Sequence, residues 1–162
     1  LDYGFLGAAA IDCYGNINTT VIGDYAAPKA RLPGSGGAND VGSFCWQTIV
    51  IMRQEKRRFA RKIDFLTTPG YLTGPGAREA AGLPAGSGPY RVITQLGVYG
   101  FEESSKRMQL LALHPGITVE QVQAESEFKI LLAPEVGTSL PPTAEERALL
   151  HEIDPMGMAV GR

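Results

Sequence analysis

Short apolar runs separated by turn-forming residues set the pattern of this chain. Residues 5–11 form an apolar run bounded by Gly4 and Asp12, which favours a buried strand. Residues 18–22 are rich in β-branched side chains, and residues 48–52 are β-branched or apolar throughout. Both compositions are typical of strands. These three runs therefore predict strands in the first third of the chain.

Further strands are predicted after a long loop-rich stretch. Glycine and proline recur throughout residues 65–89, and a loop of that length in a compact domain is usually functional or interfacial. Residues 90–94 and 98–101 are expected to pair around a turn. Residues 108–113 form another apolar run that we expect to be a strand.

Two helices are predicted near the end of the chain. Thr118 precedes a helical pattern at 119–127, and Gln121 lies three residues on, as a capping box requires. Thr143 is the expected N-cap of a last helix over residues 142–153. Together with the strands, these helices predict an α/β fold.

The segment Gly34–Asp40 is the first candidate for a ligand site. It has three glycines in four residues and is expected to lead into a short helix at 41–46. Glycine allows positive φ and leaves the backbone N–H groups open to an approaching ligand. No Lys-Ser or Lys-Thr follows, as a P-loop needs, and the glycine spacing of a dinucleotide fingerprint is absent. A plain loop that binds nothing is the alternative interpretation.

Composition and charge exclude several functional classes. A chain of 162 residues suits one domain, and its net charge of −2 gives no reason to expect a nucleic-acid partner. No apolar run approaches the ~20 residues of a membrane span, so no membrane association is expected. Cys13 and Cys45 lack metal-ligand spacing and are too few for a disulfide framework. We therefore expect no metal site and a reducing, cytoplasmic location.

Four ordered segments resemble a known family. They are residues 12–20, residues 34–40, the pair 55–59 and 62–65, and residues 113–116. Each alone is a weak signal, but their order and spacing together resemble the B subunits of the glutaconate type among the family I CoA-transferases. The resemblance covers nearly the whole chain.

This resemblance implies an open, largely parallel α/β sheet that is incomplete at its N-terminus. Residues 1–162 would then be the C-terminal portion of a single B-subunit domain. In such subunits a further stretch precedes the position of Leu1 and carries the glutamate that attacks the substrate. The resemblance also implies a homologous A subunit as partner, in an A2B2 or larger assembly.

The implied reaction moves CoA between an acyl-CoA and a carboxylic acid. The carboxylate nucleophile passes through a mixed anhydride to an enzyme-bound glutamyl-CoA thioester. The acyl-CoA is a substrate, so no permanently bound cofactor is expected. In the family, the matching turn helps form the oxyanion hole, which gives this role to Gly36 and Gly37, with Ala38 and Asn39 lining the site. No nucleophile is expected within these 162 residues, which alone should be inactive.

Other functions remain open on the same scaffold. Relatives with this B-subunit pattern include a decarboxylase of a methylglutaconyl-CoA and a ring-opening acyl-CoA hydrolase of steroid degradation. A non-catalytic subunit is a third alternative. The position that separates transfer from the other two reactions lies before Leu1.

The remaining candidates favour structural roles. Asn16 and Asn18 are more often turn formers than ligand contacts. His114 stands before Pro115 and suits a turn, and Glu55 is expected in surface or ion-pair contacts, as is Glu79. A basic cluster is expected to be a solvated or partner-facing surface, with contact to CoA phosphates second; it comprises Arg53, Lys56, Arg57, Arg58, Arg61 and Lys62.

Overall fold

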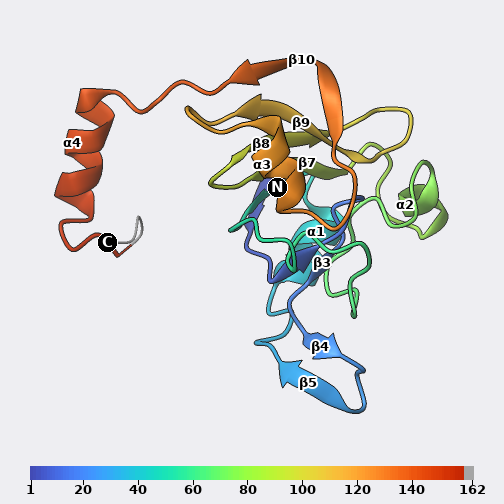
Figure 1. Ribbon diagram of the computed structural model, residues 1–162. Helices are drawn as coiled ribbons and strands as arrows, with labels where there is room; N and C mark the ends of the chain where they lie inside the picture. Colours follow the sequence, from blue (N-terminus) through green and yellow to red (C-terminus); the bar gives the residue numbers. More distant parts are fainter. Residues whose placement is uncertain (159–162) are drawn as a thin grey trace.

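The computed structural model describes residues 1–158 of the chain and places ten strands and four helices there (Figure 1). The strands are β1 (Tyr3–Leu6), β2 (Ala10–Ile11), β3 (Ile17–Asn18), β4 (Val21–Gly23), β5 (Pro28–Arg31), β6 (Gln47–Ile51), β7 (Gly88–Ile93), β8 (Gly97–Phe101), β9 (Met108–Leu113) and β10 (Leu131–Thr138). The helices are α1 (Ala38–Phe44), α2 (Ala77–Ala80), α3 (Val119–Ala124) and α4 (Ala144–Ile153).

A six-stranded open sheet in the order β1-β6-β7-β8-β9-β10 organises the molecule. The pairs β1–β6, β6–β7 and β9–β10 are parallel, whereas β8 lies antiparallel to both of its neighbours. Two antiparallel pairs, β2–β3 and β4–β5, stand outside this sheet. The predicted α/β class with a largely parallel open sheet is confirmed.

The hydrophobic core lies on one face of the sheet. Val50, Val92 and Leu110 project from β6, β7 and β9 and are fully buried. They pack against side chains from the segments that cover this face: Ile11, Ile17, Phe59, Val122, Phe128 and Ile130. Tyr99 joins the core with its hydroxyl hydrogen-bonded to Gln54 Oε1, and burial raises the pKa of Tyr99 to about 12.

The opposite face of the sheet is largely exposed over β1 and β6. Phe5 pairs in register with Ile49, so Phe5, Ile49 and Ile51 share a face because side chains alternate along strands. Phe5 is 66% exposed and Ile51 is 55% exposed, whereas Val50 on the other face is fully buried. The sheet within the described residues is therefore covered mainly from one side.

Helix α1 forms the crossover between the parallel neighbours β1 and β6, and it packs on β1, β6 and β7. Its close approach to β1 depends on Gly4, where an added Cβ would lie 2.4 Å from Val41 Cγ1 and 3.1 Å from Cys45 Sγ. The glycine-rich turn immediately precedes α1.

The structure corrects several expected element boundaries. The run 5–11 is not one buried strand: β1 ends at Leu6, and β2 pairs instead with β3 around the turn at Asp12. The expected helices at 41–46 and 119–127 are α1 (Ala38–Phe44) and α3 (Val119–Ala124). β10 was not predicted, because Pro134 and Gly137 interrupt it and its register shifts between Leu132 and Gly137. Proline is tolerated in such an edge strand.

Both predicted helix starts are confirmed. Thr118 accepts the Gln121 N–H, and the Gln121 side chain accepts the Thr118 N–H, which completes a capping box. Thr143 and Glu146 make the same reciprocal pair at the start of α4. Local sequence chemistry therefore sets these two N-termini.

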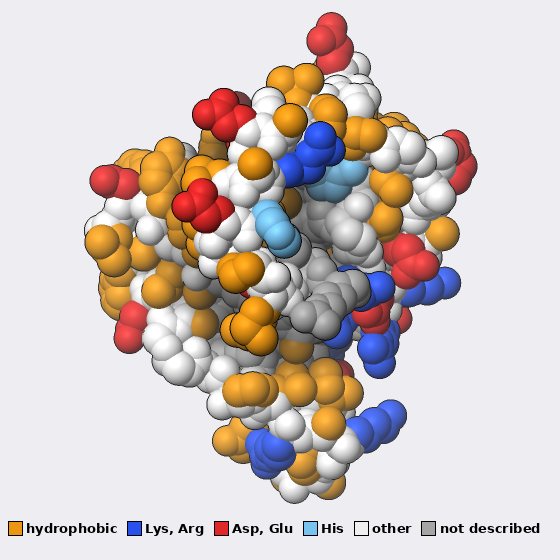
Figure 2. All heavy atoms as spheres, turned by 90° about the vertical axis from the view of Figure 1, so that its left-hand side faces the viewer, with side chains coloured by type: hydrophobic (Ala, Val, Ile, Leu, Met, Phe, Trp, Pro, Cys, Tyr) orange, Lys and Arg blue, Asp and Glu red, His pale blue; other side chains and the backbone are white. Residues whose placement is uncertain are grey.

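Two appendages extend from the sheet in different directions (Figure 1). The β4–β5 hairpin projects at the bottom of the view, and α4 lies apart at the left, beyond β10. In Figure 2 the hairpin forms the lower lobe, where hydrophobic side chains gather between basic ones. None of the helices in the described residues is long and apolar enough to cross a membrane.

We predict that Phe59→Ala lowers the free energy of unfolding of the full-length protein by about 3–5 kcal/mol, because it leaves a cavity in the hydrophobic core. The Phe59 ring is fully buried and lies 5.9 Å from the Phe128 ring and 5.7 Å from the Tyr99 ring. Leu132→Ala is the matched control, since Leu132 is 53% exposed and should cost less than about 1 kcal/mol. Urea unfolding measures both; equal losses would contradict this account of the core.

Candidate active-site turn

The glycine-rich turn takes a backbone conformation that requires glycine at two positions. Gly34 has φ 92° and Gly36 has φ 49°, both in the left-handed region that other residues rarely adopt. Gly37 returns to φ −86° and forms the N-cap of α1 without any side-chain cap. The chain thus reverses direction and enters the helix within a few residues.

Several N–H groups of this turn have no acceptor within residues 1–158. The Ala38 N–H donates to Ser35 O at 2.9 Å, but the N–H groups of Gly36, Gly37 and Asn39 make no hydrogen bond within that range. The first N–H groups of a helix lack intrahelical partners and need other acceptors. A ligand oxygen at this turn could therefore accept from adjacent backbone donors.

Hydrogen bonds of Thr19 and Thr67 hold the turn in place. The Gly34 N–H donates to Thr19 O at 2.8 Å, and the Thr19 hydroxyl donates back to Gly34 O at 2.9 Å. Thr67 Oγ1 accepts the Thr19 N–H at 2.9 Å, and Thr67 O accepts from Asn39 Nδ2 at 3.0 Å. The turn is therefore anchored at both ends to residues distant in sequence.

The turn is open to solvent around Gly36 and Gly37. A Cβ added at Gly36 or Gly37 would meet no atom within 4 Å, and both residues are exposed. Ala38 is half-buried and Asn39 is exposed, so the structure brings all four predicted site residues together at one surface. One N–H of the Asn39 amide anchors the turn, so Oδ1 and the second N–H of that side chain remain for a ligand.

A close contact between the Gly42 backbone and the Thr68 side chain holds α1 against the segment that includes Thr67. A Cβ at Gly42 of α1 would lie 2.2 Å from Thr68 Cγ2. In turn, a Cβ at Gly70 would lie 2.3 Å from the backbone carbon of Gly15. A side chain at either position would displace these neighbours, so the backbone of α1 packs closely on the Thr68 side chain and the backbone of Gly70 packs closely on the backbone of Gly15.

Arg78 lies at the centre of this packing and was not singled out from the sequence. It is 2% exposed, and its guanidinium donates to Pro69 O (3.1 Å), Gly70 O (2.8 Å), Gly42 O (3.1 Å) and Ser87 Oγ (3.0 Å). None of the ion pairs found within residues 1–158 includes it. Its only sequence signal was a lone arginine in a glycine- and proline-rich loop.

The expected structural roles of the two asparagines agree with the structure. The Asn16 side chain donates to Asp12 Oδ2 and Leu72 O and accepts the N–H groups of Gly70 and Leu72. Asn18 is 1% exposed and caps its own turn by donating to Val21 O at 2.7 Å. Burial raises the pKa of Asp12, although hydrogen bonds from Asn16 and from backbone N–H groups oppose that rise.

The basic cluster is divided between two uses. Glu55 pairs with three of its members at N···O distances of 2.9 to 3.7 Å: Arg53, Arg57 and Arg58. Chiefly the hydrogen bond from Arg57 lowers the pKa of Glu55. Arg61 and Lys62 instead line a cavity of about 390 Å³ that also includes Leu66, the residue before Thr67.

His114 takes the structural role predicted for it. Its Nδ1 lies 2.6 Å from Ser139 Oγ and its Nε2 lies 2.8 Å from Thr94 O, so both ring nitrogens are engaged. These contacts tie the end of β9 to the ends of β7 and β10. The ring is held within the fold and does not reach the glycine-rich turn through any hydrogen bond found in residues 1–158.

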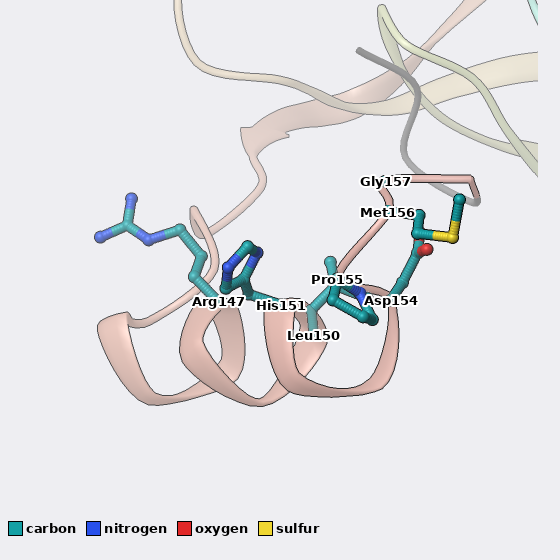
Figure 3. Close-up of a pocket in the computed structure, with 7 residues that line it drawn as sticks. All are labelled: Arg147, Leu150, His151, Asp154, Pro155, Met156 and Gly157. Atoms are coloured by element: carbon teal, nitrogen blue, oxygen red, sulfur yellow. The ribbon is translucent and has the colours of Figure 1, made fainter.

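A separate depression of about 280 Å³ lies on the C-terminal appendage (Figure 3). Leu150 and His151 of α4 form one side, and Asp154 and Met156 of the following segment form the other. Because α4 stands apart from α1 in Figure 1, this depression is distinct from the candidate site at the turn.

Comparison with known proteins decides the family. A family-wide sequence model described as coenzyme A transferase matches residues 1–125. The chain belongs to the coenzyme A transferase family. The resemblance drawn from its four ordered segments is therefore confirmed, and the glycine-rich turn falls within the matched residues.

Several known members of the coenzyme A transferase family are similar over nearly the whole chain. The B subunit of glutaconate CoA-transferase from Acidaminococcus fermentans is 45% identical over 151 residues, covering 93% of this chain and 56% of the relative. The crystal structure of that enzyme superimposes with a TM-score of 0.92 at 42% identity, covering 99% of this chain and 61% of the other.

Two other relatives differ in their named reactions. The B subunit of 3-oxoadipate CoA-transferase from Pseudomonas knackmussii is 42% identical, over 95% of this chain and 59% of the relative. An IpdB subunit of the cholesterol ring-cleaving hydrolase from Rhodococcus jostii is 28% identical, over 94% of this chain and 60% of the relative. The chain thus spans about three fifths of the length of the relatives it matches.

We predict that Thr67→Val loosens the anchor of the turn and costs about 1–3 kcal/mol of stability. Thr67 is 4% exposed, and valine would leave the Thr19 N–H and the Thr20 hydroxyl, 2.7 Å from Thr67 Oγ1, without this partner. Urea unfolding gives the loss, and hydrogen exchange of the Gly34 amide should accelerate. Thr73→Val, at an exposed threonine, is the control, and the same loss in both variants would refute the anchoring role.

Proposed function

We propose that this chain is part of the B subunit of a CoA-transferase, and that the Gly36 and Gly37 N–H groups form an oxyanion hole for the acyl-CoA thioester. The observation that carries this proposal is that the Gly36 and Gly37 N–H groups make no hydrogen bond within residues 1–158. Thr19 anchors their turn, and a Cβ at either glycine would meet no atom within 4 Å. Membership of the coenzyme A transferase family supplies the substrate class.

The proposed reaction proceeds by covalent catalysis. A carboxylate oxygen attacks the thioester carbonyl carbon, the C–S bond breaks, and CoA leaves as its thiolate to give a mixed anhydride. The thiolate then attacks the enzyme's acyl carbon, which releases the first carboxylic acid and leaves an enzyme-bound CoA thioester. The acceptor carboxylate reverses both steps. We place the nucleophilic glutamate outside residues 1–162.

The proposed role of the turn follows from where charge develops. Each attack turns a carbonyl oxygen into an alkoxide, and a preorganised N–H donor stabilises that oxygen by roughly 3–4 kcal/mol relative to its absence. Because the Gly36 and Gly37 N–H groups have no other acceptor within residues 1–158, they need not break a hydrogen bond first. Ala38 and Asn39 line the same surface.

The proposed assembly pairs this B subunit with a homologous A subunit, as A2B2 or larger, in the cytoplasm. The relatives at 45% and 42% identity are themselves named as B subunits, which supports a heteromer. Cys13 and Cys45 are free thiols, which suits a reducing compartment. Acyl-CoA is proposed as a substrate and not as a resident cofactor.

We predict that Gly37→Pro lowers kcat by about 10²–10³-fold in the full A/B complex, because proline removes one oxyanion donor. The backbone at Gly37 has φ −86°, near the proline range, and its N–H makes no hydrogen bond within residues 1–158. Gly37→Ala is the matched control: its methyl group would meet no atom within 4 Å, and its N–H remains. Thermal unfolding monitors the fold of both variants. Equal kcat values for the two would overturn the donor role of Gly37.

A second experiment tests the reaction itself. The complete A/B complex is incubated with acyl-CoA and then treated with borohydride or hydroxylamine, and the peptides are analysed by mass spectrometry. Modification of one glutamate, dependent on acyl-CoA, is the expected result. Glutaconate and 3-oxoadipate serve as acceptor acids, with water as the competing acceptor. If free acid is released, but no CoA is transferred to an acceptor acid and no thioester is trapped, the transferase proposal is replaced by a hydrolase.

A further inference from the structure

We infer that Arg78 is a positioning residue for this reaction: its buried guanidinium fixes α1, and thereby places the Gly36 and Gly37 N–H groups that immediately precede that helix. The inference rests on the proposed oxyanion role of the turn. Arg78 makes no hydrogen bond to a predicted site residue within residues 1–158, so we expect its effect on turnover to pass through the backbone that it holds.

Arg78 joins three segments that are far apart in the sequence. Its Nη2 donates to Gly42 O of α1 and to Ser87 Oγ ahead of β7. Its Nη1 donates to Pro69 O and Gly70 O. The planar guanidinium presents five N–H donors in a fixed fork, whereas the lysine ammonium is a single point. Arginine can therefore bridge these acceptors at once and lysine cannot.

The bridge leads directly to the turn. Gly42 lies on α1, five residues after the N-cap Gly37, and its backbone packs on Thr68. The neighbouring Thr67 accepts the Asn39 amide through its carbonyl oxygen and the Thr19 N–H through its hydroxyl. Arg78 thus ties the body of α1 to the same 67–70 segment that anchors the turn. A shift of α1 away from this segment would move the oxyanion donors.

The burial of this charge argues for positioning and not simply for stability. Arg78 Nε is buried and has no hydrogen-bond partner within residues 1–158, and no carboxylate there forms an ion pair with the guanidinium. Burying a charge is costly, but removing the guanidinium would also leave its four hydrogen-bond acceptors without this donor. A control substitution that removes buried hydrogen bonds elsewhere therefore separates an effect on stability from an effect on positioning.

The test uses the full A/B complex with Arg78→Met and Arg78→Lys. The matched control is Gln54→Met, because Gln54 is 1% exposed and donates to Val122 O at 3.0 Å, and its hydrogen bonds involve neither α1 nor the turn. We expect both Arg78 variants to lower kcat at least tenfold with KM for acyl-CoA changed less than threefold. Gln54→Met should keep kcat within threefold of the wild-type value, at a melting temperature similar to that of the Arg78 variants.

Hydrogen exchange supplies a readout that does not depend on turnover. The Val41 N–H donates to Gly37 O and the Cys45 N–H donates to Val41 O, so both amides report on α1. Their exchange should accelerate at least tenfold in Arg78→Met and remain unchanged in Gln54→Met. If Arg78→Met does not assemble with the A subunit, the same kcat and hydrogen-exchange measurements on Arg78→Lys decide the question.

The outcomes separate two kinds of failure. If the wild-type complex shows no acyl-CoA chemistry, the proposed function is wrong, whatever exchange shows for α1. If the wild type is active but the Arg78 variants keep its kcat and its α1 exchange, the positioning inference alone is overturned. The inference also fails if kcat falls in Gln54→Met and Arg78→Met alike, in step with melting temperature.

Discussion

The close packing of α1 on residues 67–70 is the constraint on which the rest of the site depends. Gly42 packs against Thr68 and Gly70 against Gly15, at distances that no Cβ can occupy. The buried guanidinium of Arg78 bonds carbonyl groups on both sides of the contact. Because interiors are closely packed, glycine at positions 42 and 70 lets α1 lie directly on this loop, and the position of α1 follows from that of the loop.

The glycines around the site serve two different purposes. Gly42 and Gly70 permit close packing behind the turn, whereas Gly36 and Gly37 leave space in front of it. Rigid anchoring on one side and free N–H groups on the other are what electrostatic stabilisation of a developing charge requires. In the proposed function the turn is an accessory to catalysis: it stabilises charge that a nucleophile outside residues 1–162 creates.

The sequence allowed prediction of features set by local chemistry. The apolar runs at β6 and β9, the capping boxes at Thr118 and Thr143, and the glycine-rich turn before α1 follow from short-range patterns. β10 could not be predicted, because its pairing with β9 is interrupted where the register shifts. The role of Arg78 also could not be predicted, because its acceptors on Gly42 and Gly70 lie 36 and 8 residues away. Only the folded chain brings them together.

The most direct measurement of the central claim is the position of the thioester oxygen in the assembled enzyme. A crystal structure of the full A/B complex with a bound acyl-CoA or its covalent adduct would locate it. The account predicts that this oxygen lies about 2.7–3.1 Å from the backbone nitrogens of Gly36 and Gly37. Binding of that oxygen by other donors, with the two glycine N–H groups left facing solvent, would contradict it.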